Sequence, residues 1–455
     1  MNSTRSNETD ARGVPVSTRT QSSLDAFEKA LWQFQSYFGD PTATLACALH
    51  DDPDFILGHI FNASAMLMLS ERQYLPAVQE SLATASALAP KANDRERALL
   101  AATRDLAQGR WHEAVAGWDR LLVDHPRDAL ALQCAHLIDF YLGDAVNLRD
   151  RTARVLGHWD VAVPGYSYML GLHAFGLEEC NEFERAEAAA RTALAIERRD
   201  AWSVHALTHV MEMQNRYDEG REFLEATAPD WSPDNGFAFH NWWHLGLFYL
   251  EREDFAGALA LFDERVFNPD SDSSMELLDA TALLWRLHLQ DVDVAGRWMA
   301  VANRWAMKTG VENGYYAFND FHAVVALAGA GRLDAARAVL AALGDAAKTN
   351  PPATRAMAAE VGIPACGAII AFAEQRYDEV IEILSPLRAR AHRFGGSNAQ
   401  RDILTQTLLV AALRSGRTGL ATNLLYERAV HKPASPLTRR WRTQCAQQAT
   451  YRAAA

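Results

Sequence analysis

The chain has 455 residues, of which 49% are hydrophobic and 22% are charged, and its formal net charge is −13. This composition supplies ample apolar side chains for a packed interior and excludes a largely disordered chain. The negative charge argues against a nucleic-acid-binding surface as the main function, because phosphate contacts need clustered Lys and Arg. The one basic cluster lies near the end of the chain and comprises Arg428, Lys432, Arg439, Arg440 and Arg442.

The cysteines and the apolar runs bear on the cellular compartment. Five cysteines lie far apart and form no C-x-x-C pair, as is typical of a reducing compartment. No run approaches the roughly 18 consecutive apolar residues that a membrane span needs. Residues 1–22 lack the apolar segment of a secretory signal. We therefore expect a cytoplasmic protein without membrane contact.

Helices are predicted from Ser23 onward. Apolar residues recur at intervals of three and four in the first helix, which the turn Gly39-Asp40-Pro41 ends. The same spacing continues along the chain, and no stretch keeps the alternation of apolar and polar residues that marks a β-strand. The fold class is therefore predicted to be all-α.

A short turn-and-helix signature repeats along the chain. A turn residue is followed by an aromatic residue or Leu, and then by a small residue that lets two helices approach closely. Copies begin at Gln108, Asn181, Asn215, Glu253, Gly331 and Gln375. The spacing from Phe183 to Tyr217 is 34 residues, the length of a tetratricopeptide unit.

The repeats predict helical hairpins stacked into a right-handed superhelix, a tetratricopeptide-like α-solenoid. No Pro-, Gly- or Ser-rich linker divides the apolar pattern, so one repeat domain is expected over residues 23–445. Residues 1–22 are polar throughout and are expected to form a disordered leader. Residues 446–455 are expected to form a flexible tail.

Two histidine pairs occupy corresponding places in consecutive repeats. His205 and His209 are four residues apart, as are His240 and His244, and the pairs are offset by 35 residues (240 − 205). Residues four apart lie on the same face of a helix. Both pairs fall on first helices of hairpins, which line the inner wall of a solenoid. We expect the four imidazoles to converge on one divalent ion of zinc, iron or manganese.

Glu212 lies one turn beyond His209 and is a candidate metal ligand or catalytic base. The alternative for the whole group is structural. In that case the histidines are buried polar residues that bridge helices by hydrogen bonds and pack against Trp242 and Trp243.

Asp320 and His322 form a second polar group, which can enter the same groove farther along the superhelix. Asp320 is a second candidate base, and His322 is a candidate ligand-binding residue. Because positions two apart do not share a helical face, only one of the two is expected to point inward. The alternative is a core histidine beside a solvated aspartate.

A third polar group follows Gly395-Gly396. Ser397 can cap the next helix, and polar side chains then occupy positions where the helical period expects partly apolar ones. Arg401 is a candidate to meet an anion at the helix start. The predicted ligand-binding residues here are Ser397, Gln400, Arg401 and Asp402. The alternative is a capped surface helix with a solvated first turn.

The order of these motifs resembles the tetratricopeptide repeat protein 38 family over nearly the whole chain after the leader. The stretches that carry the resemblance are HALTHVMEMQNRYDEG, HNWWHLGLFYLEREDFAGALALFDERV, FNDFHA and FGGSNAQRDILTQTLLVAALRSG. The resemblance implies a helical-repeat fold and adds Asn241 to the ligand-binding candidates. It implies no reaction, because none is established for the family.

We therefore expect a metal-assisted small-molecule site in the concave groove, with the four histidines as ligands and Glu212 or Asp320 as the base. The alternative is a non-catalytic scaffold that binds a peptide or protein partner in the groove. His and acidic residues outnumber Lys on the predicted inner helices, which favours an enzyme. No nucleic-acid or membrane partner is expected, and a homodimer is left open.

Overall fold

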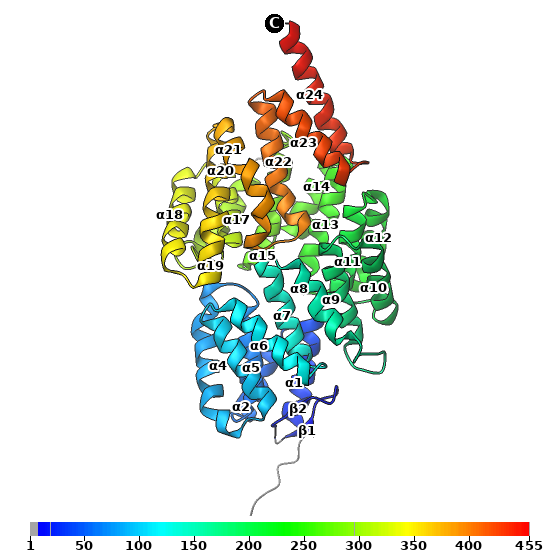
Figure 1. Cartoon of the computed structure of the whole chain (residues 1–455), viewed down its shortest axis with the longest axis vertical. Coiled ribbons are helices and arrows are strands. Elements are labelled where there is room, and N and C mark those ends of the chain that lie inside the picture. Colours follow the sequence, from blue (N-terminus) through cyan, green and yellow to red (C-terminus); the bar gives the residue numbers. More distant parts are fainter. Residues whose placement is uncertain (1–7, 19, 295, 455) are drawn as a thin grey trace, which may run out of the picture. The chain divides into compact units, whose positions relative to one another are not determined.

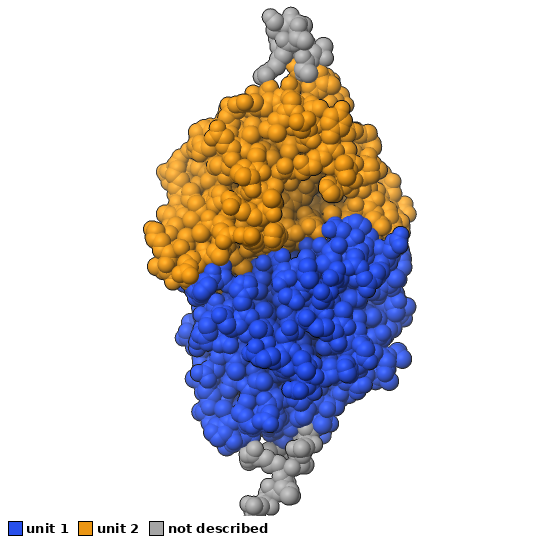
Figure 2. Space-filling model, viewed as in Figure 1, with its two compact units in different colours: residues 1–207, 230–237, 351–353 blue, residues 208–229, 238–350, 354–455 orange. Residues whose placement is uncertain are grey.

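The computed structural model describes residues 8–18, 20–294 and 296–454 (Figure 1). Apart from two strands of two residues each, their regular secondary structure is helical, which confirms the predicted all-α class. They form two compact units, coloured separately in Figure 2. Unit 1 comprises residues 1–207, 230–237 and 351–353, and unit 2 comprises residues 208–229, 238–350 and 354–455. The boundary between 207 and 208 falls inside one helix, and the prediction of a single domain over residues 23–445 stays a prediction.

Unit 1 contains one short hairpin of strands and the first helices of the chain. The strands are β1 (Glu8–Thr9) and β2 (Pro15–Val16), which pair antiparallel. The helices are α1 (Gln21–Ser36), α2 (Pro41–Asp51), α3 (Ile56–Leu67), η1 (Arg72–Tyr74), α4 (Leu75–Leu88), η2 (Ala89–Lys91), α5 (Asp94–Ala107), α6 (Trp111–Asp124), α7 (Ala129–Leu142), α8 (Ala145–Leu156), α9 (Tyr166–Glu179), α10 (Phe183–Ile196) and the first part of α11 (Ala201–Met213).

Unit 2 continues α11 and holds the remaining helices, apart from the ends of α12 and α19 that fall in unit 1. They are α12 (Tyr217–Trp231), α13 (Ala238–Glu251), α14 (Phe255–Leu261), the π-helix η3 (Phe262–Val266), α15 (Ser274–His288), α16 (Arg297–Lys308), α17 (Ala317–Gly329), α18 (Leu333–Thr349), α19 (Pro352–Met357), the π-helix η4 (Ala358–Gly362), α20 (Ile363–Ala373), α21 (Tyr377–Leu387), η5 (Arg388–Phe394), α22 (Asn398–Arg414), α23 (Thr418–His431) and α24 (Pro436–Ala454).

Five of the six predicted turns join helices shown to pack on each other, namely α5 and α6, α9 and α10, α13 and α14, α17 and α18, and α20 and α21. The turn residues Gly109, Asn181, Asn215, Glu253, Gly331 and Gln375 all have φ between 61° and 76°. This left-handed conformation reverses the chain after one helix, and the second helix begins two residues later. Its first aromatic residue packs back on the first helix, as Tyr377 does on Phe372 with ring centroids 5.4 Å apart. The chain is therefore an all-α helical-repeat solenoid, as its sequence predicted.

The predicted disordered leader is wrong for residues 8–18, and residues 1–7 and 19 lie outside the described residues. Asp10 accepts hydrogen bonds from the backbone N–H groups of Arg12 and Val14. The buried Arg12 guanidinium pairs with Asp10 and with Glu28 of α1 at 2.9 Å. The polar leader is thus ordered because its charged groups meet partners within unit 1, which composition alone does not reveal.

At the other end of the chain, helix α24 continues to Ala454, so the backbone of residues 446–454 is helical. Residue 455 lies outside the described residues. The flexibility predicted for residues 446–455 stays a prediction.

One helical stretch, residues 352–373, is long and apolar enough to cross a membrane by length and composition alone. Arg355 and Glu360 lie within this stretch, so its sequence is not a continuous apolar run. Within the structure, 61% of its most apolar window is buried, and the core helix of a soluble protein passes the same test. The stretch is therefore weak evidence for a membrane span.

Within unit 2, helices distant in sequence pack around one region. Helix α13 packs against α15 and α24, α15 packs against α22, and α22 packs against α23. Figure 1 shows α22, α23 and α24 in orange to red beside the green α13. This packing brings the last 60 or so residues onto the helix that carries the second histidine pair, which positions the site described next.

Candidate functional site

The structure brings three of the predicted histidines, His209, His240 and His244, together within unit 2. One ligand nitrogen of each of these rings lies within 4.8 Å of the others, and the three side chains are buried. The rings of His209 and His244 are 4.4 Å apart between centroids, and those of His240 and His244 are 4.9 Å apart. His205 is counted with unit 1, but it lies one turn before His209 on the same continuous helix, α11.

Aromatic side chains surround the histidines. His240 stacks on the fully buried Trp243 with an interplanar angle of 16° and a centroid distance of 5.2 Å. His244 meets the edge of the same indole at 4.8 Å. The sequence predicted a wall of both Trp242 and Trp243. Trp243 makes the ring contacts with His240 and His244, and Trp242 lies under the guanidinium of Arg265.

Two carboxylates orient two of the imidazoles. Nδ1 of His240 lies 2.6 Å from Oδ2 of Asp279, a fully buried residue of α15. Nδ1 of His244 lies 3.3 Å from Oε2 of Glu212 on α11. An ionised carboxylate can only accept, so beside one each ring would donate from Nδ1 and keep Nε2 as a ligand nitrogen. The same carboxylate–histidine arrangement supports the ligands of many protein metal sites.

The electrostatics of the cluster keep His244 neutral. Burial lowers the pKa of His244 well below its usual value, and the nearby His209 and His240 lower it further. Burial raises the pKa of Asp279, and this effect outweighs the opposite effect of His240. A neutral imidazole can donate a lone pair to an ion, whereas a protonated one cannot.

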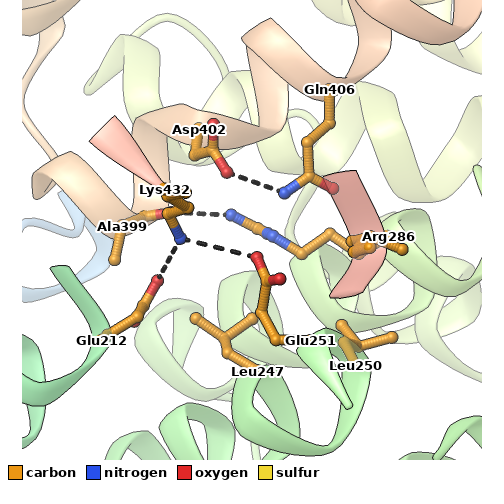
Figure 3. Close-up of a pocket in the computed structure, with 10 residues that line it drawn as sticks. Glu212, Leu247, Leu250, Glu251, Arg286, Ala399, Asp402, Gln406 and Lys432 are labelled. Carbon is orange, nitrogen blue, oxygen red and sulfur yellow. Dashed lines mark hydrogen bonds and ion pairs between the residues drawn. The ribbon is translucent and has the colours of Figure 1, made fainter. Parts of the chain in front are cut away.

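Glu212 also borders a small pocket, so it belongs to two adjoining groups of polar residues. The pocket is lined by Glu212, Leu247, Leu250, Glu251, Arg286, Ala399, Asp402, Gln406, Lys432 and Leu437, all within unit 2 (Figure 3). Its free volume of about 10 Å³ is the room that one water molecule occupies. Three carboxylates and two cations, Arg286 and Lys432, line this space, and another cation, Arg428, pairs with two of these carboxylates.

The carboxylates of the pocket are paired with cations from α23. Arg428 Nη1 lies 2.7 Å from Asp402 Oδ1, and Arg428 Nη2 lies 3.4 Å from Glu251 Oε1. Lys432 Nζ lies 3.3 Å from Glu212 Oε1 and 3.7 Å from Glu251 Oε1. Burial lowers the pKa of Lys432, but the charges of Glu212 and Glu251 outweigh burial and raise it above its ordinary value.

Arg286 is the third cation, and it donates to backbone carbonyls rather than to a carboxylate. Its guanidinium lies 2.8 Å from the carbonyl oxygen of Ala399 and 3.1 Å from that of Ala282. It also lies 5.4 Å from the ring centre of Trp243. Burial lowers the pKa of Arg286, and Asp402 and Glu212 partly offset this.

The predicted group after Gly395-Gly396 divides between two roles. Asp402 lines the pocket, and its predicted ligand-binding role stays a prediction. Ser397 and Gln400 form a reciprocal capping box at the start of α22, which supports the structural alternative for both. The Arg401 guanidinium donates to Gly396 O and Asn398 Oδ1, contacts that lend no support to its predicted meeting with an anion, and that role stays a prediction.

Asp320 and His322 are both buried, so the predicted solvated aspartate is wrong. Both carboxylate oxygens of Asp320 accept from the backbone N–H of Gly314 at 3.1 Å, which holds the loop before α17. Nδ1 of His322 lies 2.8 Å from the carbonyl oxygen of Phe318, and burial lowers the pKa of His322 to about 4. These contacts lend no support to Asp320 as a base or to His322 as a ligand-binding residue.

Asn241 is fully buried on α13, between the two histidines of its pair in sequence. Its predicted ligand-binding role, which came from the family resemblance, stays a prediction.

Sequence reasoning missed five charged residues of the site, namely Asp279, Glu251, Arg286, Arg428 and Lys432. Arg428 and Lys432 were assigned to a terminal basic cluster, which implies exposure, yet they are 6% and 7% exposed. One signal was available, since the two are four residues apart and therefore share a face of α23. A second signal was available for Asp279, which is a single acidic residue in an otherwise apolar stretch of α15.

No protein-family model matches the chain. Among solved structures, the chain is similar to yeast Tom70, with a TM-score of 0.40 and 11% identity over 90% of each chain. It is also similar to the human IFIT1 dimer with m7Gppp-AAAA, with a TM-score of 0.42 and 12% identity over 93% of this chain and 99% of that one. Likenesses this low carry no functional argument, and the closer resemblance to the tetratricopeptide repeat protein 38 family stays a prediction.

Proposed function

We propose that the paired histidines bind one divalent metal ion and that this ion makes the protein a metal-assisted enzyme for a small molecule. The observation that carries the proposal is the pair of carboxylates, Asp279 and Glu212, each placed on Nδ1 of a different histidine. Hydrogen bonds of this kind orient ligands and raise their basicity. Neutral imidazoles in a purely structural cluster do not require two buried carboxylates as partners, and burying a carboxylate costs free energy.

The cluster needs only a small adjustment to take an ion. Four nitrogens at roughly 2.1 Å from a tetrahedral ion are about 3.4 Å apart, and the ligand nitrogens here lie within 4.8 Å of one another. Imidazole ligands suit zinc or iron better than manganese, which prefers oxygen. Zinc is therefore the first ion to test.

The role of the ion depends on His205. Three imidazoles with an open fourth position are typical of catalytic zinc, where a bound water becomes the nucleophile, while four protein ligands are typical of structural zinc. His209, His240 and His244 supply three ligands from unit 2, and His205 is the candidate fourth from the preceding turn of α11. An enzyme requires His205 to leave the fourth position open to water or substrate.

Glu212 has a different role from the predicted base. Its carboxylate is occupied by His244 on one oxygen and Lys432 on the other, so in this proposal it orients a metal ligand. The base of a metal-assisted reaction would then be the hydroxide formed from metal-bound water.

Elemental analysis of protein purified without a nickel column tests the proposal. About one zinc or iron per chain is expected for the wild type, and His209→Ala and His244→Ala should each lose most of it. His50→Ala, at an exposed histidine, serves as the control and should keep the metal. His205→Ala separates the two kinds of site, because a catalytic site should retain the ion without it.

Binding should also stabilise the native state, because the unfolded chain holds no assembled site. At a free metal concentration 100 times the dissociation constant, the gain is about 2.7 kcal/mol. For a domain of the size of unit 2, this gain should raise the melting temperature by about 5–10 °C. The proposal is wrong if the wild type takes up no zinc or iron and its melting temperature does not change when metal is added. A scaffold that binds a peptide or protein would then be the better interpretation.

A further inference from the structure

The carboxylate of Glu212 connects the histidine cluster to the C-terminal helices. Its Oε2 lies 3.3 Å from Nδ1 of His244, and its Oε1 lies 3.3 Å from Nζ of Lys432, which is 220 residues away in sequence. Figure 3 shows the Lys432 side chain reaching the carboxylates of Glu212 and Glu251. The ammonium is therefore part of the environment that orients His244.

Lys432 is itself held in place. It is the C-cap residue of α23, and its backbone N–H donates to Arg428 O at 2.7 Å. The hydroxyl of Ser435, in the connection to α24, donates to Glu251 Oε2 at 2.5 Å, which fixes the second carboxylate that Lys432 meets. Only 7% of Lys432 is exposed, so the ammonium has little freedom to leave these partners.

We infer that Lys432 is a positioning residue of the metal site. It holds Glu212 where that carboxylate accepts the Nδ1 proton of His244, and this hydrogen bond presents Nε2 of His244 to the ion. The inference rests on the proposed function, since it assigns a task toward the metal. It also gives the connection between α23 and α24 a part in the site, although no metal ligand lies there.

The charges around Lys432 explain why a neutral side chain at this position should weaken metal binding. Glu212 and Glu251 both lie against the one Nζ atom, so removing the ammonium leaves two buried carboxylates facing each other. Their repulsion moves Glu212 away from His244, and the imidazole loses the partner that fixes its orientation. Metal affinity should fall even though every ligand is still present.

Titration with Co²⁺ tests the inference, because the visible absorption of the bound ion reports both its affinity and the geometry of its ligands. Lys432→Met should bind Co²⁺ about 10-fold more weakly than the wild type, which is the low end of what an outer partner contributes. Its absorption spectrum should also change, because the His244 ring turns. Lys432→Arg should restore both, since a guanidinium can meet the same two carboxylates.

Lys308→Met is the matched control. Lys308 is another buried lysine of unit 2, 8% exposed, and its Nζ donates to the carbonyl oxygen of Asp272. The control should lower stability and leave Co²⁺ affinity and spectrum unchanged. Should Lys432→Met not fold, Lys432→Gln keeps a hydrogen-bond donor at this position without the charge, and it should bind Co²⁺ about 10-fold more weakly because the repulsion between the two carboxylates remains.

The outcomes separate this inference from the proposed function. Wild-type protein that takes up no Co²⁺ refutes the metal site itself, and the role of Lys432 falls with it. Wild-type protein that binds Co²⁺ while Lys432→Met binds equally tightly with the same spectrum refutes only the positioning role. An equal loss of affinity in Lys308→Met also refutes it, because the effect would then reflect the general loss of a buried lysine in unit 2.

Discussion

Removing the Arg428 guanidinium should strongly destabilise unit 2. Arg428→Met leaves the carboxylates of Asp402 and Glu251 without their main cation, at side-chain exposures of 18% and 6%. Breaking a buried ion pair from one side costs about 3–5 kcal/mol, because the remaining charge is uncompensated. The partial exposure of Asp402 and its remaining attraction to Lys432 place the expected loss near 3 kcal/mol, the lower end of that range.

The assay is urea unfolding followed by circular dichroism and tryptophan fluorescence. Trp441 is a local reporter, since its ring centre lies 5.4 Å from Arg428 Cζ. Arg417→Met is the control, because the Arg417–Asp378 pair is 62% exposed on both sides and should contribute less than about 1 kcal/mol. Adding Asp402→Asn to Arg428→Met should recover part of the loss, since one uncompensated charge is removed.

The pH dependence provides an internal check. Burial raises the pKa of Asp402, but Arg428 and Lys432 outweigh it and hold this pKa well below its usual range. A depressed folded pKa contributes stability that is present above the unfolded pKa of about 4 and is lost as the pH falls below it. The gap between wild type and Arg428→Met should therefore narrow below about pH 4. Equal losses for Arg428→Met and Arg417→Met at pH 7 would show that the pocket charges are solvated in solution, and the reasoning would be wrong.

Three further predictions concern single residues. Asp279→Asn should weaken metal binding about 10-fold in a competitive chelator titration, because the amide orients His240 less well than the carboxylate does. Burial raises the pKa of Asp200 to about 6, so its stability contribution should fall as the pH rises from about 4 to 6, and Asp200→Asn should abolish that slope in thermal melts of the protein. Ser397→Ala should lower the free energy of unfolding by about 1 kcal/mol through the lost cap of α22, with unchanged metal content by elemental analysis.

The repeats could be predicted because their signals are local. The turn at Gln375 needs a residue that tolerates φ of 61°, followed two positions later by the aromatic Tyr377, which packs on Phe372 of the preceding helix. Both requirements act within a few residues of sequence. The convergence of His209 with His244 followed from the same register, because consecutive repeats place corresponding residues side by side.

The charged partners of the histidines could not be predicted in this way. Lys432 meets Glu212 across 220 residues, and this contact depends on how α23 packs against the earlier helices. A Lys or Arg near a chain end is usually solvated, so sequence alone favoured an exposed basic cluster. The prediction of a disordered leader was wrong for residues 8–18 for a related reason. Arg12 is buried only because Asp10 and Glu28 lie within reach of its guanidinium.

The most direct test of the metal site is a crystal structure of the zinc-loaded protein with anomalous data collected on both sides of the zinc absorption edge. The account predicts one anomalous peak about 2.1 Å from a ring nitrogen of each of His209, His240 and His244, with Asp279 and Glu212 still on Nδ1 of their rings. A fourth bond to His205 would make the ion structural, and a water in that position would support catalysis. A crystal of zinc-loaded protein without a peak among these histidines, or with the ion on other residues, would contradict the account.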